Sequence, residues 1–232
     1  GSAPPPPSNL PASSPLIGRQ LEWHALVGGL LHKRRRLAAV LGAAGVGKSA
    51  LCISTAQYLV DRRHFGGGVL YASLAGATDA AALAAAVARA LREAGKAPPR
   101  KAAIGGRRKS DGGEIEGALM SLLSALKGHP ALLFLDEAEA LLRSAAGRDA
   151  MRSLVVGALG RLPELRILFS CATALPLSGV GVVELQLSPL PPADCARLFL
   201  QLAPRVPGAA EVFDGRQPRQ ALQAEVESTA AL

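Results

Sequence analysis

The sequence has few aromatic residues, few cysteines and no long apolar segment. Aromatic residues make up only 3% of 232 residues, which fits closely packed helices on a sheet better than an aromatic-rich β-sandwich. The three cysteines, Cys52, Cys171 and Cys195, lie far apart and show no zinc-type spacing. We therefore expect reduced thiols and a cytoplasmic location. No apolar run approaches the length of about 18 residues that a membrane-spanning helix needs, so no membrane partner is expected.

Positive charge is in excess, with a net charge of +8. Much of it lies in three runs, at residues 33–36, 100–101 and 107–109. No aromatic side chains are interleaved with these charges, so a platform for base stacking is missing. Lys and Arg also suit the C-terminal end of a helix. We therefore interpret the runs as a solvated helix end and a solvated loop, and we do not expect specific nucleic-acid binding.

One motif dominates what is present. The octapeptide from 42 to 49 fits the P-loop pattern G-x-x-x-x-G-K-[ST] without a mismatch. The glycines allow backbone N–H groups to surround phosphate, Lys48 supplies a charge for the β- and γ-phosphates, and Ser49 offers a hydroxyl to Mg²⁺. The predicted nucleotide-binding residues here are Gly42, Ala43, Ala44, Gly45, Val46, Gly47, Lys48, Ser49 and Ala50. The predicted cofactors are ATP or ADP and Mg²⁺.

A second motif supplies the carboxylates that a P-loop requires. The run from 131 to 135 is apolar, as expected for a strand buried on both faces, and it ends in Asp136 and Glu137. Asp136 is the predicted second Mg²⁺ ligand, beside Ser49. Glu137 is the predicted catalytic base that orients and deprotonates the attacking water, with Lys48 also counted in the catalytic set.

Strand and helix patterns alternate along the chain. Predicted strands cover 36–41, 68–74, 131–136, 166–171 and 182–187, and amphipathic patterns between them predict helices. The fold class is therefore α/β: a three-layer P-loop NTPase with a five-stranded, mainly parallel sheet. Because one more strand and two helices separate the P-loop from Asp136, we expect a further strand between the P-loop strand and the Asp136 strand.

Two more segments resemble STAND NTPases, a class that includes NB-ARC domains. Leu16 to Glu22 resembles the hhGRExE motif ahead of the P-loop, with Gln20 in place of the usual Glu. Residues 190–199 resemble the start of the helical lid after the fifth strand. The resemblance covers about residues 16–205. It implies that Leu16, Ile17, Gly18 and Arg19 lie against the adenine and ribose.

The sequence differs from the STAND pattern after the fourth strand, and the difference bears on hydrolysis. The family usually has Thr-Thr-Arg or Thr-Ser-Arg after the fourth strand, whereas this chain has Ser170, Cys171 and Ala172. Ser170 can serve as a polar catalytic sensor, but the arginine that would contact the γ-phosphate is missing. The resemblance therefore implies slow hydrolysis.

The resulting division is a disordered Pro/Ser-rich leader at 1–15, a P-loop domain at 16–188 and part of a helical lid at 189–232. The leading hypothesis is the ATP/ADP-binding, Mg²⁺-dependent switch domain of a STAND-type signalling ATPase with slow turnover. Its expected partners are nucleotide, other domains of a longer protein and further copies of itself on activation. Two alternatives stay open: an origin-recognition-like AAA+ ATPase that acts on DNA, and a nucleotide-binding scaffold with little turnover.

Overall fold

The computed structural model describes residues 5–32, 35–96, 111–175 and 181–202. Helices and strands alternate along most of this length, as the sequence predicts. The elements, in chain order, are α1 (Gln20–Leu31), β1 (Leu37–Leu41), α2 (Lys48–Asp61), β2 (Val69–Ser73), α3 (Ala80–Glu93), α4 (Asp111–Leu126), β3 (Ala131–Asp136), α5 (Glu139–Leu142), α6 (Ala145–Arg161), β4 (Leu165–Cys171), β5 (Val182–Gln186) and α7 (Pro192–Leu202).

The five strands form one sheet in the order β2-β3-β4-β1-β5, and every pair is parallel. Strand β4 lies between β1, which leads into the P-loop, and β3, which ends at Asp136. The prediction of an inserted strand is therefore confirmed. Because all five strands run the same way, their carboxyl ends meet at one edge of the sheet, where ligands of such folds bind.

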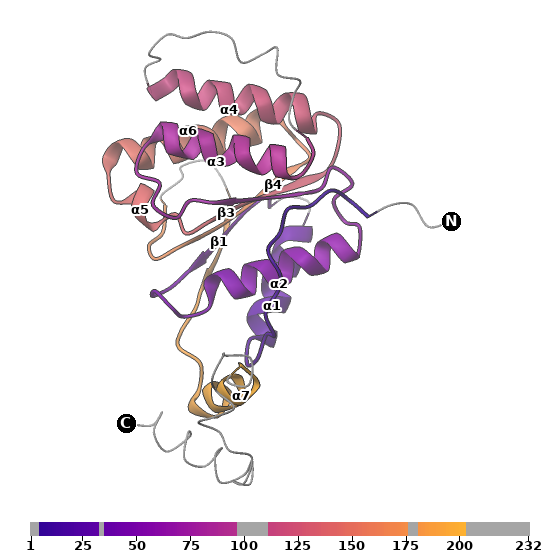
Figure 1. Ribbon diagram of the computed structural model, residues 1–232, viewed down its shortest axis with the longest axis vertical. Coiled ribbons are helices and arrows are strands. Elements are labelled where there is room, and N and C mark those ends of the chain that lie inside the picture. Colours follow the sequence, from indigo (N-terminus) through magenta and orange to yellow (C-terminus); the bar gives the residue numbers. More distant parts are fainter. Residues whose placement is uncertain (1–4, 33–34, 97–110, 176–180, 203–232) are drawn as a thin grey trace.

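Helices cover both faces of the sheet, which gives three layers (Figure 1). Helices α3, α4 and α6 pack on one face in the larger apolar core, and α1 and α2 pack on the other face in a second core. Central strands β1 and β3 are buried along their whole length. Helix α7 lies beyond the sheet, beside the start of α1 (Figure 1). No helix in the described residues is both long and apolar enough to cross a membrane.

Local signals placed most of the helices correctly. Asp79 caps α3, because its side chain accepts a hydrogen bond of 2.8 Å from the N–H of Ala82. The four-residue helix α5 was not predicted, since one turn is too short to show periodicity. The glycine-rich loop predicted at 95–113 and the weak helix predicted at 221–226 fall largely or wholly outside the described residues.

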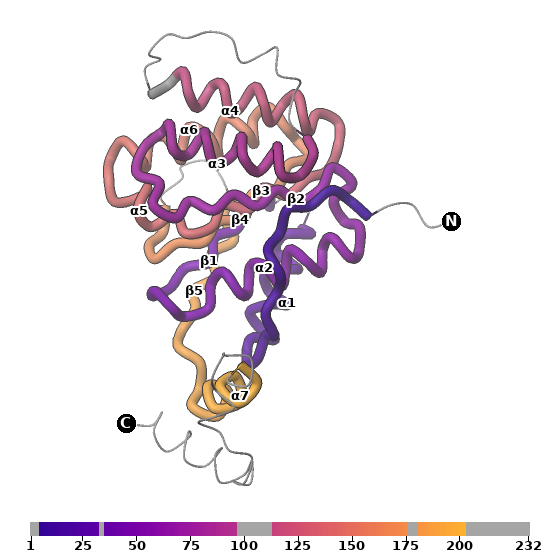
Figure 2. The backbone as a smooth tube through the Cα atoms, viewed as in Figure 1, coloured from indigo at the N-terminus to yellow at the C-terminus, as the bar shows by residue number. Residues whose placement is uncertain are grey.

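The leader that was predicted to be disordered makes specific contacts over its described part. Ser8 pairs in parallel with Val69 at the edge of β2, and the Val69 N–H bonds to the carbonyl of Pro7 at 3.0 Å. The Asn9 amide binds both backbone groups of Tyr71, at 2.7 and 2.8 Å. Figure 2 shows this indigo segment passing β2 on its way to α1. The leader thus covers an edge strand that would otherwise expose unpaired backbone groups.

Candidate nucleotide site

The P-loop connects the end of β1 to the start of α2, as its motif predicts. Gly42, Gly45 and Gly47 have φ values of 152°, 78° and 98°, a region that favours glycine. Gly47 is the N-cap of α2, so Lys48 begins the helix whose N-terminus faces the loop. Backbone N–H groups and the positive end of the helix dipole therefore converge on this loop, as phosphate binding requires.

Lys48 lies almost buried within this loop. Its ammonium nitrogen is 3.1 Å from the carbonyl oxygen of Gly42 and 3.0 Å from that of Ala43. It also forms an ion pair of 3.1 Å with Glu139 Oε1, from the first turn of α5. Glu139 was not among the predicted site residues, because only the fold brings the turn after β3 opposite the P-loop.

Asp136 lies at the carboxyl end of β3 and is 2% exposed. Its Oδ1 accepts a hydrogen bond of 2.9 Å from the Ser49 hydroxyl and a short one from the Ser170 hydroxyl. The Tyr71 hydroxyl lies 3.3 Å from its Oδ2. Ser49, Asp136 and Ser170 come from three elements and were each predicted, and the structure brings them together. Tyr71 was missed, because a tyrosine inside a strand pattern gives no signal of a site.

These residues fit a hard cation. Ser49 and Asp136 offer oxygen ligands from two directions, and Mg²⁺ in such sites takes its other ligands from phosphate and water. Within the described residues, no group of three His, Cys, Asp or Glu side chains forms a separate metal cage. Ser49 and Asp136 are therefore the residues that would hold Mg²⁺, which when bound would neutralise charge on the phosphates.

Glu137 sits in a left-handed backbone conformation, with φ of 60°. Such a conformation is uncommon for a residue with a side chain. The Glu137 N–H bonds to the Ser170 hydroxyl at 3.0 Å, so Ser170 holds both acids of the motif. The Glu137 carboxylate lies 3.5 Å from the Ser73 hydroxyl at the end of β2. This places it at the carboxyl edge of the sheet, where the prediction of a catalytic base requires it.

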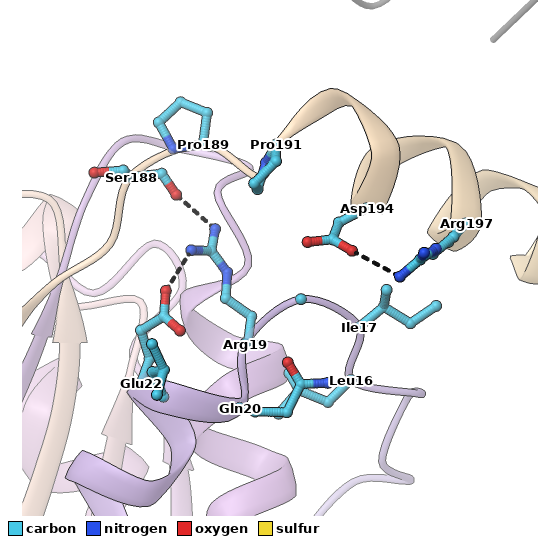
Figure 3. A pocket seen from close by; sticks show the side chains of 12 residues that line it. Leu16, Ile17, Arg19, Gln20, Glu22, Ser188, Pro189, Pro191, Asp194 and Arg197 are labelled. Carbon is cyan, nitrogen blue, oxygen red and sulfur yellow. Dashed lines mark hydrogen bonds and ion pairs between the residues drawn. The ribbon is translucent and has the colours of Figure 1, made fainter. Parts of the chain in front are cut away.

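A pocket of about 480 Å³ lies between the Leu16–Glu22 segment and α7 (Figure 3), and its lining residue Arg19 connects it to the P-loop at Val46. All four predicted adenine-contacting residues, Leu16, Ile17, Gly18 and Arg19, line it. The Arg19 guanidinium is nearly buried and donates to the carbonyls of Val46 and Ser188, at 3.1 and 2.6 Å, and to Glu22 at 2.9 Å. Arg19 therefore joins the P-loop, the chain after β5 and α1, and fixes the walls of the pocket.

Helix α7 closes the pocket on its other side. Asp194 and Arg197, which form an ion pair of 3.6 Å, line the pocket opposite Ile17 (Figure 3). A Cβ added to Gly18 would lie 2.4 Å from Asp194 Oδ2, and Gly18 has φ of 67°. Glycine is thus required here both by the backbone and by the close approach of α7.

Burial changes the acidity of three groups around the site. Burial raises the pKa of Tyr71 to about 12, and the Asp136 carboxylate adds to the shift. Burial also raises the pKa of the Cys171 thiol to about 12, with a further contribution from Glu139. The pKa of the Cys52 thiol is raised in the same way by burial and by Asp136. In all three groups the shift of the pKa favours the protonated form.

The sequence between residues 15 and 170 matches the AAA ATPase domain family, which is more than half of the chain. The matched region includes the P-loop, Asp136, Glu137 and Ser170. The chain belongs to the AAA ATPase domain family. This membership confirms the P-loop ATPase class that was predicted from the residues, and it leaves the narrower STAND assignment without confirmation. No curated protein matches the sequence.

Solved structures of AAA ATPases share the fold. The structure of the Aeropyrum pernix ORC1 protein in complex with DNA matches with a TM-score of 0.62, 18% identity, and coverage of 93% of this chain and 66% of that one. The structure of Cdc6p from Pyrobaculum aerophilum matches with a TM-score of 0.57, 18% identity, and coverage of 95% and 56%. This AAA ATPase domain chain therefore spans about two thirds or less of these neighbours.

A STAND protein with a tetratricopeptide repeat sensor, from Pyrococcus horikoshii, also matches. Its TM-score is 0.48, its identity 13%, and the match covers 88% of this chain and 28% of that one. A similarity at this level does not bear on the choice between a signalling and a DNA-directed ATPase. The TM-scores of the ORC1 and Cdc6p structures show that they share the fold of this chain.

Proposed function

We propose that this AAA ATPase domain binds ATP·Mg²⁺ at residues 42–50 and Asp136, and acts as a nucleotide-controlled switch. The observation that carries the proposal is the contact of 2.9 Å between Ser49 and Asp136, directly beside Lys48. The Ser49 hydroxyl and the Lys48 ammonium group, both from the first turn of α2, lie there with the Asp136 carboxylate from the end of β3. This is the donor set that a magnesium nucleotide needs.

Hydrolysis by this domain is proposed to be slow. Glu137 would act on a water at the carboxyl edge of the sheet, a role supported by the hydrogen bond of its backbone N–H to the Ser170 hydroxyl. The position after Cys171 that carries arginine in STAND relatives holds Ala172, whose side chain brings no charge to the γ-phosphate. The expected turnover therefore resets a switch rather than driving continuous work.

The position of α7 relative to the P-loop domain would change with the bound nucleotide. The proposed adenine pocket has one wall on the P-loop domain and the other on α7, so a bound nucleotide would contact both. A ligand that contacts two bodies favours the arrangement in which both contacts are made. Together with the STAND-like segment at Leu16 to Glu22, this supports a signalling role, with other domains and further copies of the chain as the partners that respond.

The first test is Lys48→Ala, with titration of a fluorescent ATP analogue. We expect affinity to fall about 10- to 100-fold, because a charged hydrogen bond to phosphate contributes roughly 1.5–3 kcal/mol. Lys127→Ala is the matched control, since Lys127 is an exposed lysine at the end of α4, away from the P-loop. Equal affinity of the Lys48 variant and the wild type would contradict the proposed nucleotide site.

A DNA-directed ATPase is the second candidate, favoured by the similarity to the ORC1 structure that contains DNA and by the net charge of +8. It predicts DNA binding with sequence preference, and ATP turnover that DNA stimulates. Binding driven by charge alone loses orders of magnitude in affinity between about 50 and 200 mM salt. Sequence-selective DNA binding that persists at the higher salt concentration would favour this candidate over the signalling switch.

A further inference from the structure

The ammonium group of Lys48 has a full set of partners within the protein. A lysine carries three N–H donors, and Lys48 faces three acceptors: the carbonyls of Gly42 and Ala43 and the Glu139 carboxylate, all at 3.0–3.1 Å. The Lys48 side chain is only 8% exposed. A nucleotide phosphate that binds Lys48 must therefore replace one of these three partners.

Glu139 is the partner that can leave. The two carbonyls belong to the backbone of the P-loop, whose shape is set by its glycines and by α2. The Glu139 carboxylate is the end of a flexible side chain that is 30% exposed, so water can solvate it after it leaves Lys48. Its departure therefore requires a change of rotamer and no change of fold.

The backbone that carries Glu139 is firmly held. The Ala138 N–H bonds to the Ser170 carbonyl at 3.1 Å, and Leu141 and Leu142 are buried in the larger core. This anchoring keeps the Glu139 side chain opposite the P-loop. A displaced carboxylate consequently stays near the phosphates, which carry charge of the same sign.

The three carboxylates at the end of β3 and in the turn that follows it thus have three different partners. Asp136 binds Ser49, Glu137 lies near Ser73, and Glu139 pairs with Lys48. The first two have the positions expected for metal binding and for water activation. Glu139 occupies one of the three acceptor positions around the Lys48 ammonium group.

We infer that Glu139 competes with nucleotide phosphate for Lys48 and so lowers the affinity of the site. The inference rests on the proposed nucleotide site and adds that a side chain of the protein itself competes with the nucleotide for that site. ATP or ADP binds only when the Lys48–Glu139 ion pair opens. The ion pair therefore sets the nucleotide concentration at which the switch responds.

The test is Glu139→Gln, which removes the charge and keeps the size and an acceptor oxygen. We expect the dissociation constants of fluorescent ADP and ATP analogues, measured at fixed Mg²⁺, to fall about three- to tenfold, the size expected for losing one partly exposed charged partner. Glu164→Gln is the matched control, because Glu164 is exposed before β4, at the opposite edge of the sheet. The control should bind like the wild type.

A gain in affinity separates this role from a structural one, because damage to the fold weakens binding. Glu139→Asp tests direct contact, since it keeps the charge but shortens the side chain by one methylene; we expect affinity between those of the wild type and the Gln variant. An unchanged or weaker affinity in Glu139→Gln, with the wild type binding normally, overturns the inference alone. The inference is also overturned if the Glu139→Asp variant binds nucleotide with the affinity of the wild type while the Gln variant binds more tightly. Absence of nucleotide binding by the wild type overturns the proposed function as well.

Discussion

Ser170 connects the two acids that the candidate site depends on. Its hydroxyl donates to Asp136 and accepts from the Glu137 N–H, and it is fully buried at the end of β4. An apolar residue of similar size cannot replace this serine, because the Asp136 carboxylate and the Glu137 N–H would each lose a hydrogen bond to its hydroxyl. The structure therefore gives Ser170 a positioning role within the protein, in addition to the sensor role predicted from its place after the fourth strand.

Glu137→Gln should separate binding from turnover. The amide keeps the shape of the side chain and removes its capacity to accept a proton, so we expect nucleotide affinity to change less than about twofold. General base catalysis typically contributes 10²- to 10⁴-fold, so single-turnover hydrolysis should fall by at least about 100-fold. Quenched-flow measurement with excess protein checks this. A single-turnover rate equal to that of the wild type would mean that Glu137 is not the catalytic base.

At the scale of elements, the sequence could predict what depends on local pattern. The P-loop, the strand before Asp136 and the Asp79 cap each have a signal within about ten residues, and each is found where expected. The position of Glu139 on Lys48 depends on β3 and β1 being separated by β4, which is a property of the sheet. The one-turn helix α5 that carries Glu139 is too short to show a helical periodicity of apolar residues.

The leader is a second example of contacts that local sequence cannot predict. Its composition, rich in Pro and Ser, predicts disorder because it offers little apolar surface to bury. Asn9 and Pro7 instead find partners in the edge of β2, a surface that exists only after the sheet has formed. Composition reports what a segment can bury and contains no information about an edge that needs covering.

Gly18→Ala should disturb the contact between the Leu16–Glu22 segment and α7. The added Cβ would lie 2.4 Å from Asp194 Oδ2 and would sit at a φ of 67°, which costs about 1 kcal/mol by itself. Helix α7 has to move to accept it, so we expect nucleotide affinity to fall about tenfold and the melting temperature to drop by a few degrees. Fluorescence titration and thermal melts measure both.

Gly28→Ala is the matched control within α1. A Cβ at Gly28 meets no atom within 4 Å, and alanine is about 1 kcal/mol better than glycine inside a helix. This variant should bind nucleotide like the wild type and melt at a slightly higher temperature. If Gly18→Ala bound nucleotide as tightly as Gly28→Ala, the wall formed by α7 would have no part in the nucleotide site.

At the scale of the whole molecule, the N-terminal segment has two separable tasks. Residues 7–9 cover the edge of β2, and residues 16–19 form one wall of the pocket that α7 closes. Arg19 belongs to the second task, because it joins the P-loop at Val46 to the chain after β5 at Ser188. Truncation at two points can therefore distinguish fold stability from ligand binding.

Removal of residues 1–15 should lower the melting temperature and leave the stabilisation by ADP intact. Removal of residues 1–22 should also abolish most of that stabilisation, because the pocket wall and the Arg19 contacts are lost. A ligand at 100 times its dissociation constant adds about 2.7 kcal/mol to the folded state, or roughly 5–10 °C for a domain of this size. Thermal melts of the three proteins with and without ADP and Mg²⁺ decide it. If the protein lacking residues 1–22 kept the full ADP shift, Leu16 to Arg19 would not hold the nucleotide, and the STAND-like segment would lose its proposed role.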